Sequence, residues 1–149
     1  MIERVYITNH DYEDEKGLVK MGRAESGTPV SINSRVREAD FVIGVGNIVP
    51  HCYAVWVGGG IIIQPGVCGE ETTELMPNRW LAGKLEGNKV RREMDAVALN
   101  AGLKSIVNTI LNRDDEVSHL VIGDPIEAFK QGVETAEKMY CLRGLDTRT

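Results

Sequence analysis

The chain has 149 residues, of which 42% are hydrophobic and 26% charged, and its formal net charge at pH 7 is −5. This length and apolar content suit one globular domain, residues 1–149, with a core of its own. An acidic chain with only 5% aromatic residues lacks the basic, aromatic-interleaved surface of nucleic-acid-binding proteins, so we expect no nucleic-acid partner.

Local composition excludes two further classes. The longest mostly apolar stretch, residues 42–67, is interrupted by polar residues, prolines and glycines. It is therefore neither a membrane span nor a signal sequence, and we expect a cytoplasmic location without a membrane partner. The three cysteines form no C-x-x-C pair, which argues against a disulfide framework and a structural zinc site.

The first half of the chain predicts short strands. Residues 4–8 alternate as a strand would, and residues 18–21 and 30–32 flank a turn at residues 26–29, which predicts a hairpin. Residues 41–45 are apolar at successive positions, a pattern typical of a strand in the middle of a sheet that is covered on both faces.

The second half is more regular. Apolar residues at helical spacing predict a helix over residues 89–101, with Gly102 as its stop. Residues 105–111 and 117–122 predict two strands. Asp124 as N-cap and Pro125 at the first helical position predict the start of a last helix.

This order of elements indicates an α/β or α+β layered sandwich, in which helices cover a mixed sheet. A full Rossmann fold is not indicated. Gly44 and Gly46 lack the third glycine of a dinucleotide fingerprint, and Pro50 rather than a helix follows them.

Residues 50–66, with the sequence P-H-C-Y-A-V-W-V-G-G-G-I-I-I-Q-P-G, contain the clearest candidate site. His51 follows a proline that restricts the backbone, and an imidazole titrates near neutral pH, so His51 is a candidate acid or base. The alternative is a histidine that caps the end of the strand or hydrogen-bonds a backbone carbonyl.

The polar and glycine positions around His51 allow two interpretations each. Three consecutive glycines, residues 58–60, could bring backbone N–H groups close to an anion such as phosphate, or could serve turns with positive φ. Thr72 and Thr73 could donate to a phosphate or cap a helix. His10 and Asp11 could form an orienting pair or a solvated pair without function.

Residues 50–73 resemble the signature of the nickel-dependent lactate racemase family, which is written P-H-x-x-A-G-F-S-G-G-x-K-x-x-x-P-G and is followed by T-T or T-I and a later His. Similar landmarks in family order lie at residues 9–11, 27–33, 39–40, 85–88, 106–108 and 123–125. The chain is similar to the later half of the N-terminal domain of this two-domain α/β family.

The resemblance implies racemisation or epimerisation of 2-hydroxy acids by hydride transfer, with a nickel-pincer nucleotide tethered through a lysine. His51 matches one of two catalytic histidines, and the other lies upstream of Met1 in the family sequence. The matching cofactor-binding positions are Gly58, Gly59, Gly60, Pro65, Gly66, Thr72 and Thr73.

Two departures from the family pattern bear on this chemistry. Ile61 stands at the position of the tether lysine, and an alkyl chain cannot form the covalent link. Asn78 or Arg79 stands opposite the nickel-ligating histidine, and neither is a normal nickel ligand. We therefore predict no metal site, no tethered cofactor and no activity of this chain alone.

Three hypotheses follow. The first is an enzyme-derived domain that still binds a 2-hydroxy acid or a nucleotide at His51. The second is a racemase in which a partner chain supplies the missing histidine and domain, with an untethered cofactor. The third is a non-catalytic module or homo-oligomer that assembles through an exposed apolar surface. That surface would comprise Val55, Trp56, Val57, Ile61, Ile62 and Ile63.

Overall fold

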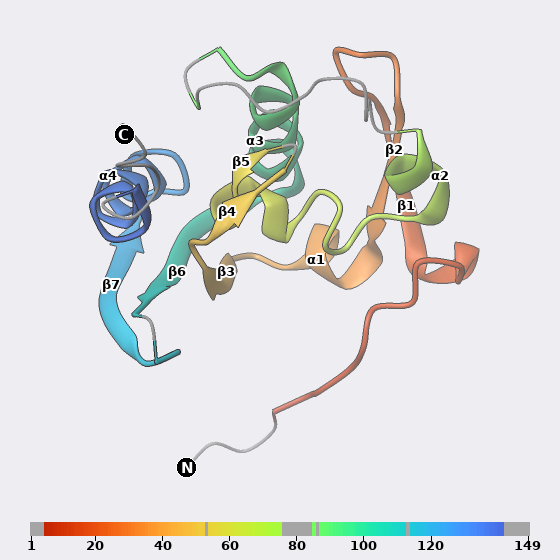
Figure 1. The fold of residues 1–149 in the computed structure, drawn as a ribbon. Coiled ribbons are helices and arrows are strands. Elements are labelled where there is room, and N and C mark those ends of the chain that lie inside the picture. The colour runs from red at the N-terminus through yellow and green to blue at the C-terminus, as the bar shows by residue number, and fades with distance from the viewer. Residues whose placement is uncertain (1–4, 53, 76–84, 86, 113, 142–149) are drawn as a thin grey trace.

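A computed structural model of the chain describes residues 5–52, 54–75, 85, 87–112 and 114–141. Its strands are β1 (Leu18–Arg23), β2 (Pro29–Asn33), β3 (Val42–Asn47), β4 (Pro50–His51), β5 (Val55–Trp56), β6 (Leu103–Leu111) and β7 (Val117–Gly123). Its α-helices are α1 (Ser34–Glu38), α2 (Glu70–Glu74), α3 (Lys89–Ala101) and α4 (Glu127–Cys141), and two short 3₁₀ turns are η1 (Glu15–Gly17) and η2 (Gly59–Ile62) (Figure 1).

The predicted hairpin is confirmed. β1 and β2 pair antiparallel with Lys20 opposite Ser31, and the amide of Ala24 donates to the carbonyl of Thr28 to close the connection. The side chain of Asn33 then accepts from the amide of Arg35 and starts α1. A side-chain cap of this kind satisfies one of the free N–H groups in the first turn of a helix.

The main sheet has the strand order β3-β6-β7, with β3 parallel and β7 antiparallel to β6. A parallel pair requires a crossover connection, and here the crossover runs from β3 through β4, β5, η2, α2 and α3 to β6. The predicted mixed sheet with helices is therefore confirmed. The crossover carries every residue of the candidate site.

Local signals set the bounds of the two long helices. The Asn88 side chain accepts from the amide of Arg91 at 2.8 Å, and Gly102 ends α3 in the left-handed conformation with φ 103°. Asp124 caps α4 as predicted, because its carboxylate accepts from the amides of Ile126 and Glu127. These bonds lower the pKa of Asp124. None of the described helices is both long and apolar enough to cross a bilayer.

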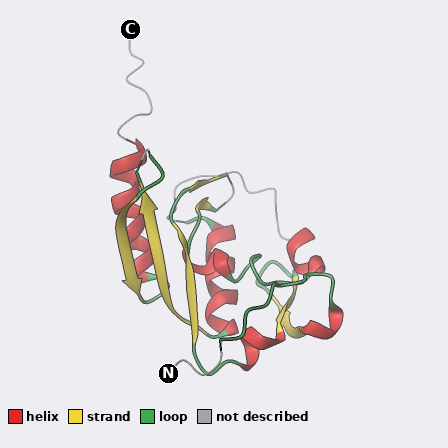
Figure 2. Ribbon diagram, turned by 90° about the horizontal axis from the view of Figure 1, so that it is seen from below, coloured by secondary structure: helices red, strands yellow, loops and turns green. Residues whose placement is uncertain are grey.

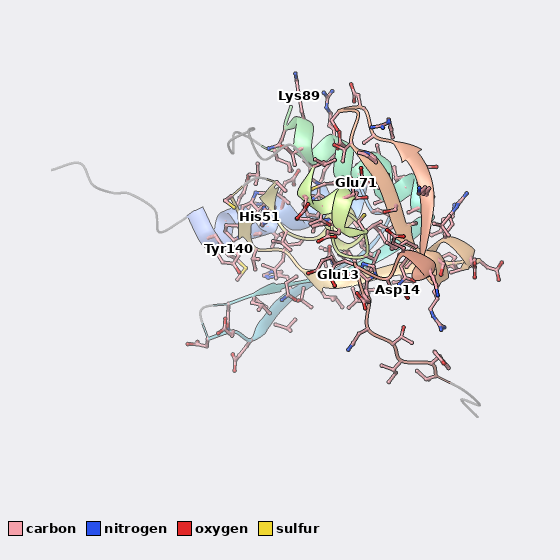
Figure 3. The ribbon with its side chains drawn as sticks, turned by 90° about the vertical axis from the view of Figure 1, so that its right-hand side faces the viewer. Glu13, Asp14, His51, Glu71, Lys89 and Tyr140 are labelled. Atoms are coloured by element: carbon pink, nitrogen blue, oxygen red, sulfur yellow. The ribbon has the colours of Figure 1, made fainter. Side chains whose placement is uncertain are left out.

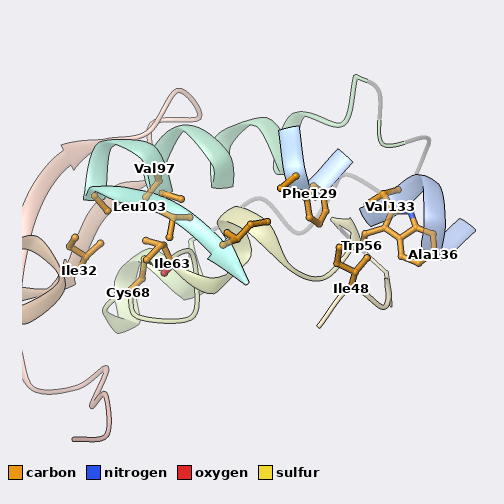
Figure 4. Close-up of a cluster of buried hydrophobic side chains, with 14 of the residues drawn as sticks. Ile32, Ile48, Trp56, Ile63, Cys68, Val97, Leu103, Phe129, Val133 and Ala136 are labelled. Atoms are coloured by element: carbon orange, nitrogen blue, oxygen red, sulfur yellow. Dashed lines mark hydrogen bonds between the residues drawn. The ribbon is translucent and has the colours of Figure 1, made fainter. Parts of the chain in front are cut away.

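The core lies between one face of the main sheet and the elements η2, α3 and α4 (Figures 2 and 4). Ile106 and Ile110 of β6 are fully buried, together with Val97 of α3 and with Phe129 and Val133 of α4. Alternate residues of a strand face opposite sides of a sheet, so these side chains mark the inner face.

Two predictions about strands are wrong. Residues 5–8 are not part of a strand: the chain there is exposed and unpaired. The apolar run at residues 41–45 does not lie in the middle of a covered sheet, because β3 is an edge strand and 62% of Phe41, 53% of Ile43 and 71% of Val45 are exposed. No described element covers the outward face of β3.

Candidate functional site

His51 lies in a two-strand hairpin at the start of the crossover. β4 pairs antiparallel with β5, which places His51 opposite Val55. The half-buried side chain, labelled in Figure 3, accepts a hydrogen bond at Nδ1 from the amide of Ala54 at 3.1 Å. A ring nitrogen that accepts carries a lone pair, so the neutral imidazole holds its proton at Nε2. His51 thus caps the turn between the two strands.

The three glycines after the hairpin are buried and bonded within the chain. The amide of Gly59 donates to Oδ1 of Asn108 at 2.9 Å, and the amide of Gly60 donates to the carboxylate of Asp95. Gly58 and Gly59 have φ values of 97° and 58°, which glycine adopts without strain. The predicted anion-binding amides of Gly59 and Gly60 therefore already bind acceptors of the protein itself.

Arg91 of α3 holds this glycine segment in place. The residue is 3% exposed. Its guanidinium donates to the carbonyls of Trp56 and Gly58 at 3.2 and 2.9 Å and stacks 3.6 Å from the ring centroid of Phe129. It also pairs with Asp95, with Nη2 to Oδ1 at 2.9 Å and Nε to Oδ2 at 3.1 Å.

Burial acts against the charge of both partners in this pair. It lowers the pKa of Arg91 and raises the pKa of Asp95, and the attraction between the two groups opposes both shifts. Sequence reasoning missed this pair. One signal was available: Arg91, Asp95 and Ala98 have the i, i+4, i+7 spacing of one helix face, next to the apolar stripe of α3.

The remaining matched positions lie in the middle of the crossover, where Thr72 joins α2 to β2. Thr72 is fully buried, and its hydroxyl accepts from the amide of Ser31 at 2.9 Å. Thr73 donates its hydroxyl to the carbonyl of Gly69 at 3.2 Å. Pro65 follows a cis peptide bond and Gly66 is exposed. The role of these residues in cofactor binding stays a prediction.

Ile61, at the position of the tether lysine, is half-buried and packs against Ala54, Val90 and Met94. Asn78 and Arg79 lie outside the described residues. Within the described ranges, no three His, Cys, Asp or Glu side chains are grouped as metal ligands would be.

The predicted interface through residues 55–57 and 61–63 is wrong for Trp56 and Ile63. Trp56 is 4% exposed and Ile63 is 2% exposed, and both belong to the main core. These two residues therefore belong to the core rather than to an interface, and whether the chain forms an oligomer stays a prediction.

His10 does not pair with Asp11. Its Nδ1 contacts the Asn33 amide at 3.1 Å and its Nε2 contacts the carbonyl of Cys68 at 2.8 Å. The carboxylate of Asp11 accepts instead from the amide of Glu13. His10 thus joins the N-terminal segment to the end of β2 and to the middle of the crossover. Burial raises the pKa of the Cys68 thiol to about 12, so this thiol stays protonated at neutral pH.

Val55 has a backbone conformation that favours glycine. Its φ is 68°, a strained value for a β-branched residue, and the family signature has glycine at this position. We expect Val55→Gly to cost less than about 0.5 kcal/mol of unfolding free energy, because relief of strain offsets the lost side chain. Val57→Gly, at a neighbouring half-buried position without a positive φ, should cost about 2 kcal/mol. Urea unfolding of both variants checks this, and equal losses would contradict it.

Comparison with known proteins agrees with this geometry. The family model described as "Lactate racemase N-terminal domain" matches residues 1–84. The chain is 28% identical over 149 residues to the lactate racemase of Lactiplantibacillus plantarum, with 94% of this chain and 35% of that protein covered. It is 27% identical over 141 residues to the lactate racemase of Thermoanaerobacterium thermosaccharolyticum, with 90% of this chain and 33% of that protein covered.

Solved structures show the same relationship. The lactate racemase apoprotein from T. thermosaccharolyticum superposes with a TM-score of 0.80 at 27% identity, and the match covers 87% of this chain and 33% of that one. A protein from Thermotoga maritima shares the fold, with a TM-score of 0.68 at 18% identity over 89% of this chain and 39% of that one.

The mixed sheet and its glycine-containing crossover thus define an α/β domain of the lactate racemase type. The chain belongs to the lactate racemase N-terminal domain family, which confirms the resemblance seen in the sequence. It spans about a third of the length of the curated relatives it matches. The cytoplasmic location stays a prediction, and so does the assignment of residues 1–149 to a single domain.

Proposed function

We propose that this chain is a lactate racemase-like domain that does not racemise 2-hydroxy acids on its own. The observation that carries the proposal is Ile61, whose alkyl side chain stands where the family tethers its cofactor and packs against Ala54, Val90 and Met94. An alkyl group offers neither a nucleophile nor a charge for a covalent link. The described residues therefore do not fit a tethered nickel-pincer nucleotide.

The hydrogen bonds of the site support the same proposal. Nδ1 of His51 is engaged by the amide of Ala54, so Nε2 carries the proton in the neutral ring. A histidine in this tautomer cannot take a proton at Nε2 unless the ring changes partners. The glycine amides that could bind a phosphate donate to Asn108 and Asp95 instead.

The test is to produce the chain in cells that make the pincer cofactor and to measure nickel, intact mass and lactate racemisation. We expect the wild-type protein to contain no nickel, to have its unmodified mass and to leave L-lactate unchanged by chiral chromatography. D-lactate formed by the wild-type protein would contradict the proposal. An Ile61→Lys variant, with Ile61→Met as its control, asks whether one residue restores the tether: a cofactor-sized mass increase in the lysine variant alone would mean that it does.

A second candidate function is the binding of a 2-hydroxy acid at His51 without turnover. The position of His51 favours it, because the residue matches a catalytic histidine of the family signature and an imidazole can hydrogen-bond a carboxylate or hydroxyl oxygen. Titration with L-lactate, followed by ¹⁵N–¹H correlations of the histidine rings, should shift the signals of His51 saturably. The signals of His119, exposed on β7, should not move. A titration without a His51 shift would contradict this function.

A further inference from the structure

Gln64 is a polar residue that the core encloses completely. It lies in the crossover shortly after η2, and it is 0% exposed. Its backbone amide donates to the carbonyl of Gly60 at 3.1 Å, which fixes the main chain at this position. Its neighbour Ile63 belongs to the main apolar core drawn in Figure 4. The side chain of Gln64 therefore lies in the packed interior and not at the surface.

The carboxamide of Gln64 has no hydrogen-bond partner in the part of the chain that the structure describes. This holds for both of its polar atoms, Oε1 and Nε2. A glutamine amide offers two N–H donors and an oxygen with two lone pairs. Burial of such a group without partners is costly, and nearly all buried polar groups in proteins bond to protein atoms or to ordered water. The Gln64 amide thus requires a partner that the protein atoms around it do not supply.

Other fully buried polar side chains of this core bond to the protein itself. Asn108 carries the same kind of amide and is also 0% exposed. Its Oδ1 accepts from the amide of Gly59 at 2.9 Å, and its Nδ2 donates to the carbonyl of Val107 at 3.2 Å. The hydroxyl of Thr72, equally buried, accepts from the backbone of β2. The missing partner distinguishes Gln64 from both of these residues.

The enclosure of Gln64 limits what its partner can be. This chain alone already buries the side chain fully, so neither a further segment of a longer protein nor a second molecule could reach the amide without opening the core. The partner must be small. It must also donate to Oε1 and accept from Nε2. An ammonium ion cannot accept and a halide ion cannot donate, whereas water does both.

We propose that the carboxamide of Gln64 binds an internal water molecule. The oxygen and one N–H group of a primary amide point to the same side, so one water can donate to the first and accept from the second. Buried waters typically make about three hydrogen bonds to polar groups that lack other partners, and they are costly to remove. The crossover between η2 and α2 is then held by a polar contact as well as by apolar packing.

Magnetisation transfer between water and the side-chain amides tests this proposal on the ¹⁵N-labelled wild-type chain. We expect the N–H signals of Gln64 to show cross-peaks to water that have opposite signs in the laboratory and rotating frames, as dipolar contact with a long-lived water gives. Proton exchange gives equal signs. The side-chain signals of Asn108, whose amide bonds to the protein, are the control and should show no such cross-peak. A Gln64 amide without the cross-peak, or equal cross-peaks from both amides, would overturn the proposal.

A substitution tests the same water through stability. Gln64→Met keeps nearly the same volume and removes both polar atoms. If water satisfies the amide, the variant gains nothing from their removal, and we expect its urea midpoint to lie at or below that of the wild type. Ile63→Met, at the neighbouring buried position, measures the effect of a methionine on the packing of this core. An amide without any partner would instead make Gln64→Met more stable than the wild type, and a raised midpoint would contradict the proposal.

Discussion

Replacing Arg91 with methionine is expected to lower the free energy of unfolding by about 3–5 kcal/mol, the usual cost of removing one partner of a buried ion pair. The variant keeps most of the side-chain volume against Phe129 but leaves the Asp95 carboxylate buried without its guanidinium. It also removes the donor to the carbonyls of Trp56 and Gly58. Urea unfolding measures the loss.

Two further variants separate charge from packing. Arg92→Met changes the exposed neighbour on the same helix and should cost less than about 0.5 kcal/mol. The double variant Arg91→Met with Asp95→Leu removes both charges and should recover most of the loss. A single Arg91→Met variant as stable as the wild type would show that the guanidinium does not hold the glycine segment.

The destabilisation of Arg91→Met should also depend on pH. Burial already raises the pKa of Asp95 above its ordinary value of 3.8, and loss of Arg91 raises it further. A carboxyl group whose pKa is raised by folding binds more protons in the folded state than in the unfolded chain. The folded state therefore loses stability as the pH rises from the pKa of the unfolded chain to the pKa of the folded protein. The gap between variant and wild type should therefore be smaller at pH 4 than at pH 7.

Gly59→Ala is expected to cost about 3 kcal/mol of unfolding free energy, from two causes that can be separated. The residue has φ 58°, and a methyl group there would overlap the Arg91 guanidinium and press on the Phe129 ring. The strained backbone accounts for about 1 kcal/mol, and overpacking in a filled core accounts for about 2 kcal/mol.

Gly27→Ala is the matched control for this prediction. Gly27 also has a positive φ, of 88°, but a methyl group there would meet nothing within 4 Å. It should therefore show only the backbone cost of about 1 kcal/mol. Equal losses in the two variants, measured by thermal or urea unfolding, would mean that the packing of Gly59 on Arg91 contributes nothing.

Features with local causes could be predicted from the sequence. The hairpin around residues 24–28, the bounds of α3 between Asn88 and Gly102, and the Asp124 cap depend on turn and capping residues within a few positions of each other. The family could be recognised for the same reason, since the glycines and prolines of its signature form one continuous pattern.

Features decided by distant parts of the chain could not be predicted. The sequence of an apolar strand does not show whether a second layer covers it, so the exposure of Val45 could not be predicted. Trp56 and Ile63 gave the opposite error: they resembled a surface patch, but α3, α4 and β6 bury them. Arg91 is 35 residues away from Trp56 along the chain, and no local pattern indicates that contact.

The pair of Arg91 and Asp95 gives the glycine segment a ligand-independent shape. In a site that only a bound cofactor organises, loss of the cofactor also removes the stability that binding supplied. Here the Asp95 carboxylate accepts from the amide of Gly60, and the Arg91 guanidinium donates to the carbonyl of Gly58. The shape of the glycine segment therefore depends on contacts within the chain and not on the residue at position 61.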